Sequence, residues 1–405
     1  MTNVINSQCC IAGGGPAGMM LGLLLARAGI RTTVLEKHSD FLRDFRGDTI
    51  HPSTLELIHE LGLLGAFLDL PHHRAKYIGA QFGERHLRLA DFTSLPVQCG
   101  FVAFMPQWDF LDFLAVQGRN YPGFDLRMQA EVTQTIEQNG VVQGVRAKTA
   151  AGELEVRADL VVAADGRAST VRSCSGLKVD VLGAPMDVLW FSLPLESGDP
   201  DESSGHFDAG GILITIRRRE HWQCGFVITK GTADALREQG IEALREKIVE
   251  LAPLFKPRID TLRTWDDVKL LTVAVDRLSQ WHRPGLLLIG DAAHAMSPIG
   301  GVGVNLAIQD AVASANLLWE PLRDGTMTEA VLAAVQRRRA WPTRVTQGLQ
   351  LQVQNRFIKT VLAGSGQLAP PLPLRIISRV PMLQRLPARL IGLGVRPEHI
   401  RSPQT

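Results

Sequence analysis

The chain has 405 residues, of which 45% are hydrophobic and 21% charged, so it is long enough for one large domain or two closely packed ones in a globular enzyme. A formal net charge of +2, without a long basic run, argues against a nucleic-acid partner. The five cysteines are scattered without metal-site spacing, so we expect no metal and a reducing, cytoplasmic environment. The N-terminus shows no signal-peptide pattern, and no apolar segment reaches the length of a membrane span.

The first predicted elements form a βαβ unit. Gln8–Ala12 is predicted to be a short buried strand, Met19–Ala28 an apolar helix that Gly29 ends, and Ile30–Leu35 the second strand. This order is typical of a parallel sheet covered by helices.

The middle of the chain favours additional strands, including those of a separate, mostly antiparallel sheet. Short alternating runs between residues 132 and 156, interrupted by Asn139-Gly140 and Gly152, predict a β-meander, and a buried strand follows at Asp159–Ala164. Beyond it we predict three strands of the separate sheet, a long helix, another buried strand and an apolar helix: Val188–Leu195, Gly211–Arg217, Trp222–Ile228, Ala233–Leu251, Leu286–Ile289 and Asn305–Leu318.

A glycine-rich turn from Gly13 to Gly18 joins the first strand to the first helix with the pattern GxGxxG. In this pattern the first glycine makes the turn, the second lets the backbone approach a pyrophosphate, and the third lets the helix pack on the sheet. The phosphates then lie at the positive end of the helix. Glu36 ends the second strand, 18 residues after Gly18, where a carboxylate accepts hydrogen bonds from ribose hydroxyls. The turn predicts an adenine dinucleotide but does not separate FAD from NAD.

Two later segments share one design, a buried strand followed by an acidic residue beside a glycine. Asp165-Gly166 follows the strand at Asp159–Ala164, and Gly290-Asp291 follows the last predicted strand and continues into the glycine-rich run from Met296 to Asn305. Together with the N-terminal turn, and over about residues 5–345, these segments resemble the three motifs of the class A flavoprotein monooxygenases, the para-hydroxybenzoate hydroxylase family.

The resemblance implies an α/β fold: a Rossmann-like FAD-binding domain of the GR2 type, an interleaved, mostly antiparallel β-sheet domain for the substrate, and a helical C-terminal segment. The implied boundaries are residues 1–72, 106–177 and 281–345 for the FAD-binding domain, residues 73–105 and 178–280 for the substrate domain, and residues 346–405 for a C-terminal helical arm.

The resemblance also implies roles for individual residues. Asp291 is similar to the aspartate that binds the ribityl chain of FAD, with a helix cap as the alternative. The loop from Pro298 to Gly303 resembles the loop whose N–H groups face the flavin ring, with a plain connector as the alternative. Asp165-Gly166 resembles a motif linked to FAD and nicotinamide binding, with a tight turn capped by Ser169 as the alternative.

Three further positions extend this candidate site. Arg46 resembles an arginine that reaches the pyrophosphate, which suits its forked donors, and Gln107 resembles a glutamine near the ribityl chain. His51 either faces the substrate or is structural, and the candidate catalytic positions are Pro298, Gly300 and Gly301. The predicted cofactor-binding residues are Gly13, Gly15, Pro16, Ala17, Gly18, Glu36, Lys37, Arg46, Gln107, Asp165, Gly166, Gly290, Asp291, Pro298, Gly301, Val302, Gly303 and Asn305.

The function that the resemblance implies is FAD-dependent hydroxylation. NADPH or NADH reduces FAD, O2 forms a flavin C4a-hydroperoxide, and one oxygen atom enters a small, aromatic substrate. No second GxGxxG follows a strand, so the nicotinamide is expected to bind transiently. Epoxidation, a Baeyer–Villiger reaction, a reductase of the geranylgeranyl reductase type and a flavin-binding protein without turnover are alternatives, and both a monomer and a homodimer fit.

The last 60 residues depart from the family motifs. A helix is predicted at Leu349–Leu362, prolines interrupt the chain from Pro370 to Pro373, and Leu374–Leu393 is apolar with four interspersed arginines, Arg375, Arg379, Arg385 and Arg389. This segment has two interpretations, a basic amphipathic helix that touches a membrane surface or an arm packed on the enzyme body or a partner subunit. We favour the packed arm.

Overall fold

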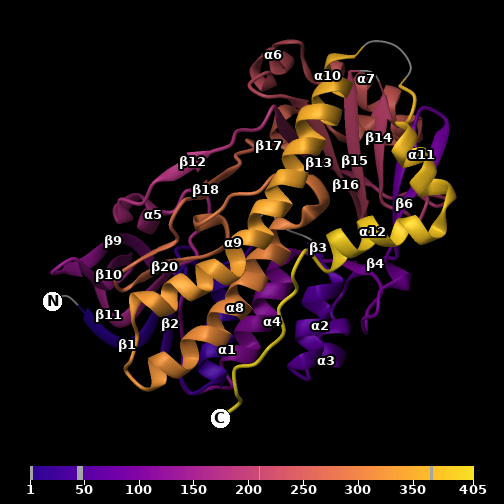
Figure 1. Cartoon of the computed structure of the whole chain (residues 1–405). Helices are drawn as coiled ribbons and strands as arrows, with labels where there is room; N and C mark the ends of the chain where they lie inside the picture. The colour runs from indigo at the N-terminus through magenta and orange to yellow at the C-terminus, as the bar shows by residue number, and fades with distance from the viewer. Residues whose placement is uncertain (1–2, 43–48, 209, 365–367) are drawn as a thin grey trace.

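The computed structural model describes residues 3–42, 49–208, 210–364 and 368–405, and its largest sheet carries the βαβ unit (Figure 1). Among these residues the sheet has eight strands in the order β19-β20-β11-β1-β2-β8, and β10 and β9 extend it from β11. The pairs β20–β11, β11–β1, β1–β2 and β2–β8 are parallel. The strands are β1 (Asn3–Ala12), β2 (Thr32–Leu35), β8 (Phe124–Arg127), β9 (Glu131–Gln138), β10 (Val141–Thr149), β11 (Gly152–Ala163), β19 (His282–Arg283) and β20 (Leu286–Leu288).

Three helices pack together on this sheet, α1 (Pro16–Arg27), α4 (Gln107–Gly118) and α8 (Gly303–Arg323). Helix α1 begins with a proline at its first turn, which favours a helix start. All of its residues from Ala17 to Ala26 are buried, because the sheet lies on one side and α4 and α8 lie on the others.

A second sheet of seven strands, counted in the described part of the chain, has the order β17-β13-β16-β15-β14-β5-β6. All of its pairs are antiparallel except β14–β5. Alternate residues of β13 pack into apolar clusters on the two faces of this sheet. Leu189 and Phe191 pack against α7 on one face, whereas Val188 and Trp190 lie on the other. The bounds are β5 (Tyr77–Phe82), β6 (Arg85–Asp91), β13 (Met186–Pro194), β14 (Ser204–Asp208), β15 (Gly211–Arg217), β16 (His221–Thr229), β17 (Lys269–Leu271), α6 (Ala233–Glu238) and α7 (Ile241–Leu251).

Smaller elements connect the two sheets. A three-stranded sheet, as far as the structure describes it, has the order β3-β7-β4, and a β12–β18 pair lies beside helix α5. Their bounds are β3 (Thr49–Ile50), α2 (Pro52–Glu60), α3 (Leu64–Leu68), β4 (His73–Ala75), β7 (Val102–Phe104), α5 (Thr170–Ser175), β12 (Val179–Val181) and β18 (Asp276–Leu278).

The C-terminal part runs along the whole molecule (Figure 1). Helix α9 (Glu329–Gln352) continues through the π-helical segment η6 (Val353–Ile358) into α10 (Lys359–Ala363), and so passes from the first sheet to the second. Helices α11 (Leu372–Arg379) and α12 (Pro381–Gly392) then pack on β6, and the tail returns to α1, where the N–H of Thr405 donates to the carbonyl of Arg27 (3.1 Å). None of the described helices is long and apolar enough to cross a membrane.

The predicted fold class is confirmed, with differences at individual elements. The strand predicted at Asp159–Ala164 is the end of one long strand, β11, which begins at Gly152. The helix predicted at Ala233–Leu251 is two helices, because Gly240 between them has φ +89°. The segment Leu374–Leu393 is likewise two helices, separated at Val380 before Pro381. The division into domains at the boundaries given above stays a prediction.

Candidate active site

The turn between β1 and α1 has the geometry of a phosphate cradle. Gly13 has φ +103°, and a Cβ placed on it would lie 2.4 Å from the carbonyl oxygen of Ala164. A Cβ on Gly18 would lie 1.9 Å from the carbonyl oxygen of Gly13. Gly15 differs, because a Cβ there would meet nothing within 4 Å beyond its chain neighbours. Open space therefore lies beside Gly15 at the N-terminus of α1, where an anion is favoured.

Glu36 stands at the end of β2 and is tied to this turn. Its Oε2 accepts a hydrogen bond from the N–H of Gly14 (3.0 Å), and its Oε1 accepts one from the N–H of His38 (3.1 Å). These bonds hold the carboxylate beside the cradle, as a ribose ligand requires. The neighbouring Lys37 is exposed.

Asp165-Gly166 follows β11 and abuts the cradle, since a Cβ on Gly13 would also lie 2.7 Å from the Cα of Asp165. The carboxylate of Asp165 accepts from the hydroxyl of Ser169 (2.5 Å) and from the N–H of Val171 (3.2 Å). Burial raises the pKa of Asp165, although these bonds partly oppose the shift. Ser169 caps α5, so the turn that we gave as the alternative role is present, and a role in nucleotide binding stays a prediction.

Gly290-Asp291 follows β20 and lies between two helices. A Cβ on Gly290 would be 3.1 Å from the Cβ of Ala307 in α8 and 3.4 Å from the Cβ of Ala17 in α1. The short helix η4 (Gly290–Ala292) has Ile289 as its N-cap and no side-chain capping bond. The carboxylate of Asp291 is part-exposed and lies 3.5 Å from Nη2 of Arg167. It therefore does not serve as a helix cap.

The loop from Pro298 to Gly303 contains two glycines in the left-handed region, Gly300 (φ +76°) and Gly301 (φ +63°). The carbonyl of Gly301 accepts from the hydroxyl of Thr49 (3.0 Å) and lies 3.1 Å from Nε2 of His51. The N–H of Gly301 donates to the carbonyl of Pro298 (3.0 Å), so this donor is used within the loop.

Asn305, just after this loop, binds the start of α2. Its Oδ1 accepts hydrogen bonds from the hydroxyls of Ser53 (2.7 Å) and Thr54 (2.8 Å). The start of α2 and the start of α8 are thus joined by buried polar bonds. This junction helps to fix the loop from Pro298 to Gly303, which lies just before Asn305.

His51 is buried, and burial lowers its pKa to about 4 despite contacts with the backbone of Gly301 and Ile391. The ring is therefore neutral at neutral pH, and with its proton on Nε2 it donates to Gly301. This contact gives His51 a part in positioning the loop; a role toward the substrate stays a prediction. Gln107 is the first residue of α4, and Arg46 lies outside the described residues.

A buried ionic network lies behind the Gly290 turn and was not predicted from the sequence. Asp310 accepts from the N–H of Gly290 (3.1 Å), from Nε2 of His294 (2.6 Å) and from Nε of Arg339 (2.9 Å). Burial would raise the pKa of Asp310, but His294 and Arg339 outweigh it and the pKa is lowered. Arg339 also reaches the carboxylate of Glu398 (3.3 Å). The only signal in the sequence was a charged residue within an apolar helix.

Three glutamines of the long C-terminal helix also hold this region. Nε2 of Gln347 donates to the carbonyls of Asp276 (2.8 Å) and Ala295 (3.1 Å). Nε2 of Gln350 donates to the carbonyls of Ser297 and Ile299, both at 2.9 Å, and Nε2 of Gln354 donates to Gly183 (3.3 Å). The buried Oε1 atoms of all three have no partner among the described residues. The helix thus fixes the loop and presents acceptors in the interior.

Comparisons with known proteins agree with this geometry. A family model described as an FAD binding domain matches residues 6–348. The 6-methylpretetramide 4-monooxygenase of Streptomyces rimosus is 34% identical over 98% of this chain and 94% of its own.

Two solved structures share the fold. A probable FAD-dependent monooxygenase of Pseudomonas aeruginosa has a TM-score of 0.75 at 22% identity, over 88% of this chain and 97% of that one. A p-nitrophenol 4-monooxygenase of Pseudomonas putida has a TM-score of 0.75 at 19% identity, over 96% of both chains. The chain therefore belongs to the family of FAD-dependent aromatic monooxygenases that the three motifs indicated.

Proposed function

We propose that this monooxygenase uses NADPH or NADH and O2 to hydroxylate a fused-ring, phenolic substrate of the aromatic polyketide type. The proposal draws on the relative that acts on 6-methylpretetramide, which this chain matches over nearly its full length. A second relative from the same species, 29% identical over 76% of this chain, is a 12-dehydrotetracycline 5-monooxygenase and anhydrotetracycline 6-monooxygenase.

The residues of the site fit FAD. Open space beside Gly15 at the start of α1 suits the pyrophosphate, and the positions of Glu36 and Asp291 suit the ribose and the ribityl chain. When bound, FAD supplies the redox chemistry and the reaction with O2. The protein supplies the cradle and the fixed loop from Pro298 to Gly303.

One observation carries the substrate class, an aromatic wall formed by the second sheet and the segment η6. Phe207 stacks on Phe82 at 5.1 Å between ring centroids and meets Phe357 at 5.4 Å. Trp190 and Ile299 belong to the same apolar cluster. Sites for flat apolar ligands combine such walls with few polar groups.

The sheet and the helical segment that form the wall also carry polar atoms that lack a partner. Nε1 of Trp190 is buried without a hydrogen bond to any described residue, as are the Oε1 atoms of Gln350 and Gln354. Buried polar groups are rarely left unpaired. One donor and two acceptors beside an aromatic wall suit the hydroxyl and carbonyl groups of a phenolic polycycle, which would hold the ring to be hydroxylated in place.

The test is oxygen transfer to a defined compound. The FAD-loaded protein would be incubated with NADPH or NADH and a panel of hydroxylated naphthacenes and anthraquinones, with single-ring phenols for comparison. We expect the polycyclic compounds to accelerate NAD(P)H oxidation and one labelled oxygen from O2 to appear in the product. A reduced product without label would contradict the proposal, and so would acceleration by single-ring phenols alone.

A tryptophan pair gives a matched test of the wall. Trp190→Phe removes an unpaired buried N–H, so we expect stability to be kept while the KM for the substrate rises about 5- to 100-fold. Trp265, whose Nε1 is also buried without a described partner, belongs to the core on the other side of the second sheet. Trp265→Phe should therefore leave the KM unchanged, and equal KM values for both variants would place the substrate elsewhere.

A further inference from the structure

The C-terminal arm, defined here as α11 and α12, repeats one ten-residue pattern. Pro371–Val380 and Pro381–Leu390 each carry a proline, an apolar residue, an arginine, an apolar residue, a second arginine and a final apolar residue at matching positions. The matching pairs are Pro371 and Pro381, Leu372 and Met382, Arg375 and Arg385, Ile376 and Leu386, Arg379 and Arg389, and Val380 and Leu390.

The repeated apolar and basic residues recur at positions three and four apart, which are neighbours on a helix. All six repeated apolar side chains are exposed, by 40% to 74%. The opposite face is held to the enzyme, since Gln384, Ala388 and Gly392 are buried and Ala388 joins the apolar cluster of Phe92. The arm is thus packed on the enzyme body, as we favoured, and still presents an apolar face to solvent.

The charge of this face has one sign. Between residues 360 and 397 the sequence has five arginines and no acidic residue. The guanidinium groups of Arg375, Arg379, Arg385 and Arg389 form no ion pair with any carboxylate that the structure describes. A second copy of the same face would bring like charges together, whereas an anionic surface would neutralise them.

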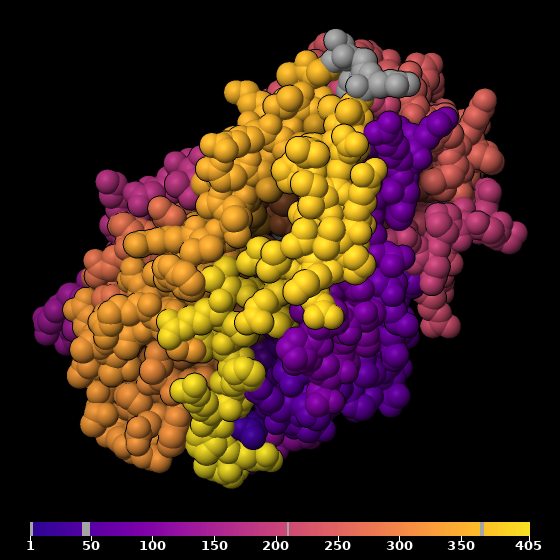
Figure 2. Space-filling model, turned by 45° about the vertical axis from the view of Figure 1, so that its right-hand side comes forward, coloured from indigo at the N-terminus to yellow at the C-terminus, as the bar shows by residue number. Residues whose placement is uncertain are grey.

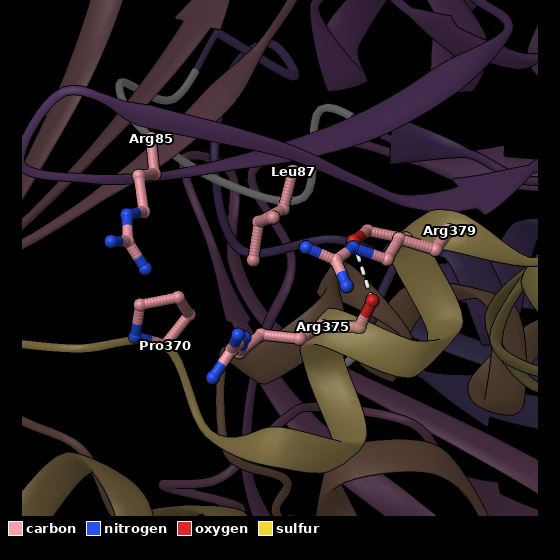
Figure 3. Close-up of a pocket in the computed structure, with 6 residues that line it drawn as sticks. Arg85, Leu87, Pro370, Arg375 and Arg379 are labelled. Carbon is pink, nitrogen blue, oxygen red and sulfur yellow. Dashed lines mark hydrogen bonds between the residues drawn. The ribbon is translucent and has the colours of Figure 1, made fainter.

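A cavity beside the arm is lined by positively charged side chains. It has a volume of about 220 Å³. Its walls come from β6 (Arg85 and Leu87), from α11 (Arg375, Ser378 and Arg379) and from Pro370, two residues before α11. Figure 3 shows the three arginines arranged around this cavity, with Leu87 above its centre. Guanidinium groups around a small cavity suit a phosphate, and arginine binds phosphate through two parallel bonds.

We propose that the arm docks on a membrane surface that contains anionic phospholipid. The exposed apolar side chains enter the boundary between headgroups and acyl chains, and the arginines bind the headgroup phosphates. Figure 2 shows a hollow framed by the helix of α9 and α10 on one side and by the arm on the other. Docking would place this hollow beside the bilayer.

The test is vesicle flotation with the full, FAD-loaded chain. We expect binding to phosphatidylcholine vesicles that contain one third phosphatidylglycerol, little binding to phosphatidylcholine alone, and weaker binding at high salt. Arg379→Gln with Arg389→Gln should weaken binding by about 25-fold, or about fivefold for each arginine. Ile376→Ser with Leu386→Ser should weaken it by more than about tenfold.

Matched controls separate the arm from general effects. Val116 and Val181 are comparably exposed elsewhere, by 54% and 79%, so Val116→Ser with Val181→Ser should leave binding unchanged. The control for charge is Arg31→Gln with Arg237→Gln, which removes two arginines outside the arm and should also leave vesicle binding unchanged. Absence of binding to anionic vesicles, or equal losses in arm and control variants, would overturn the proposal. The proposal would also be overturned if the arm formed dimers and no vesicle binding were seen. It would be overturned equally if the protein bound polyglutamate and this binding were unchanged by Ile376→Ser with Leu386→Ser.

Discussion

Two glycines of the cradle, only two residues apart, should respond to the same substitution in opposite ways. Gly15→Ala adds a methyl group to open space at φ −73°, a normal value for alanine, so the fold should keep its stability. FAD affinity should fall by about tenfold or more, because the methyl occupies the space for the pyrophosphate. Gly13→Ala should instead lower the free energy of unfolding by about 3 kcal/mol, since its Cβ would lie 2.4 Å from Ala164.

Urea unfolding of the FAD-free proteins and flavin titration check this pair. Unchanged FAD affinity in Gly15→Ala would show that the open space holds no phosphate.

Asp291 gives a second test at the scale of one residue. If its part-exposed carboxylate accepts from a ribityl hydroxyl, Asp291→Ala should weaken FAD binding by about 1–3 kcal/mol, or roughly 5- to 150-fold. The control is Asp234→Ala, whose carboxylate is 89% exposed and which should leave FAD affinity unchanged. Fluorescence titration of the FAD-free protein measures both, and equal affinities would remove Asp291 from the FAD site.

At the scale of single residues, the sequence predicted the glycines that the backbone geometry requires. It did not predict which buried polar side chains bind one another. Gly13 and Gly290 could be recognised because close packing leaves a signature in the residue type itself. Asp310 and Gln350 could not, because their partners lie on other segments of the chain: Asp310 meets Arg339, and Gln350 meets Ser297 and Ile299. Such pairs depend on how helices cross, which a local pattern does not contain.

Among the elements, the packing of α8 against α9 rests on the buried pair of Asp310 and Arg339. Arg339→Met removes the guanidinium group but keeps most of the apolar stem. The buried carboxylate of Asp310 then loses its bond to Nε of Arg339, and Glu398 loses its contact with Nη1. We expect the free energy of unfolding to fall by about 3–5 kcal/mol. The neighbouring Arg337 is exposed, so Arg337→Met should change it by less than about 0.5 kcal/mol. Chemical denaturation of both variants measures these changes. A similar small loss of unfolding free energy in both would mean that the buried network contributes little to stability.

Elements were predicted well where one periodicity held and less well where a single residue interrupted it. The βαβ unit and strands β15 and β16 follow their patterns closely. The helix from α9 to α10 was predicted only from Leu349, although it begins at Glu329. The part before Leu349 carries buried polar residues such as Arg339 and Gln347, so no continuous apolar stripe marks it as a helix. The break at Val380 follows from the proline after it.

For the whole molecule, two buried histidines predict how stability depends on pH. Burial lowers the pKa of His51 and of His206 to about 4. Between pH 6.5 and 4 the unfolded chain therefore binds protons that the folded chain does not. Stability is unaffected above this range and falls through it, by up to about 3 kcal/mol for each histidine.

Urea unfolding at pH 7 and pH 5 measures this effect. His51→Asn with His206→Asn should flatten the dependence, whereas His59→Gln, at an exposed position, should not. An unchanged slope in the double variant would assign the acid sensitivity to other groups.

The return of the tail to α1 has a consequence for how the protein is made. Arg27 binds the carbonyls of Ser402 and Pro403, and Arg339 binds Glu398, so residues 398–405 are synthesised after every segment that they hold. The bond from Arg27 to Ser402 closes across 375 positions of sequence, and contacts of such separation form late and slowly. Until these residues have been synthesised, the growing chain has the glycine cradle but lacks the bonds from Arg27 to Ser402 and Pro403. The FAD-binding half therefore completes its folding only after residues 398–405 have been synthesised.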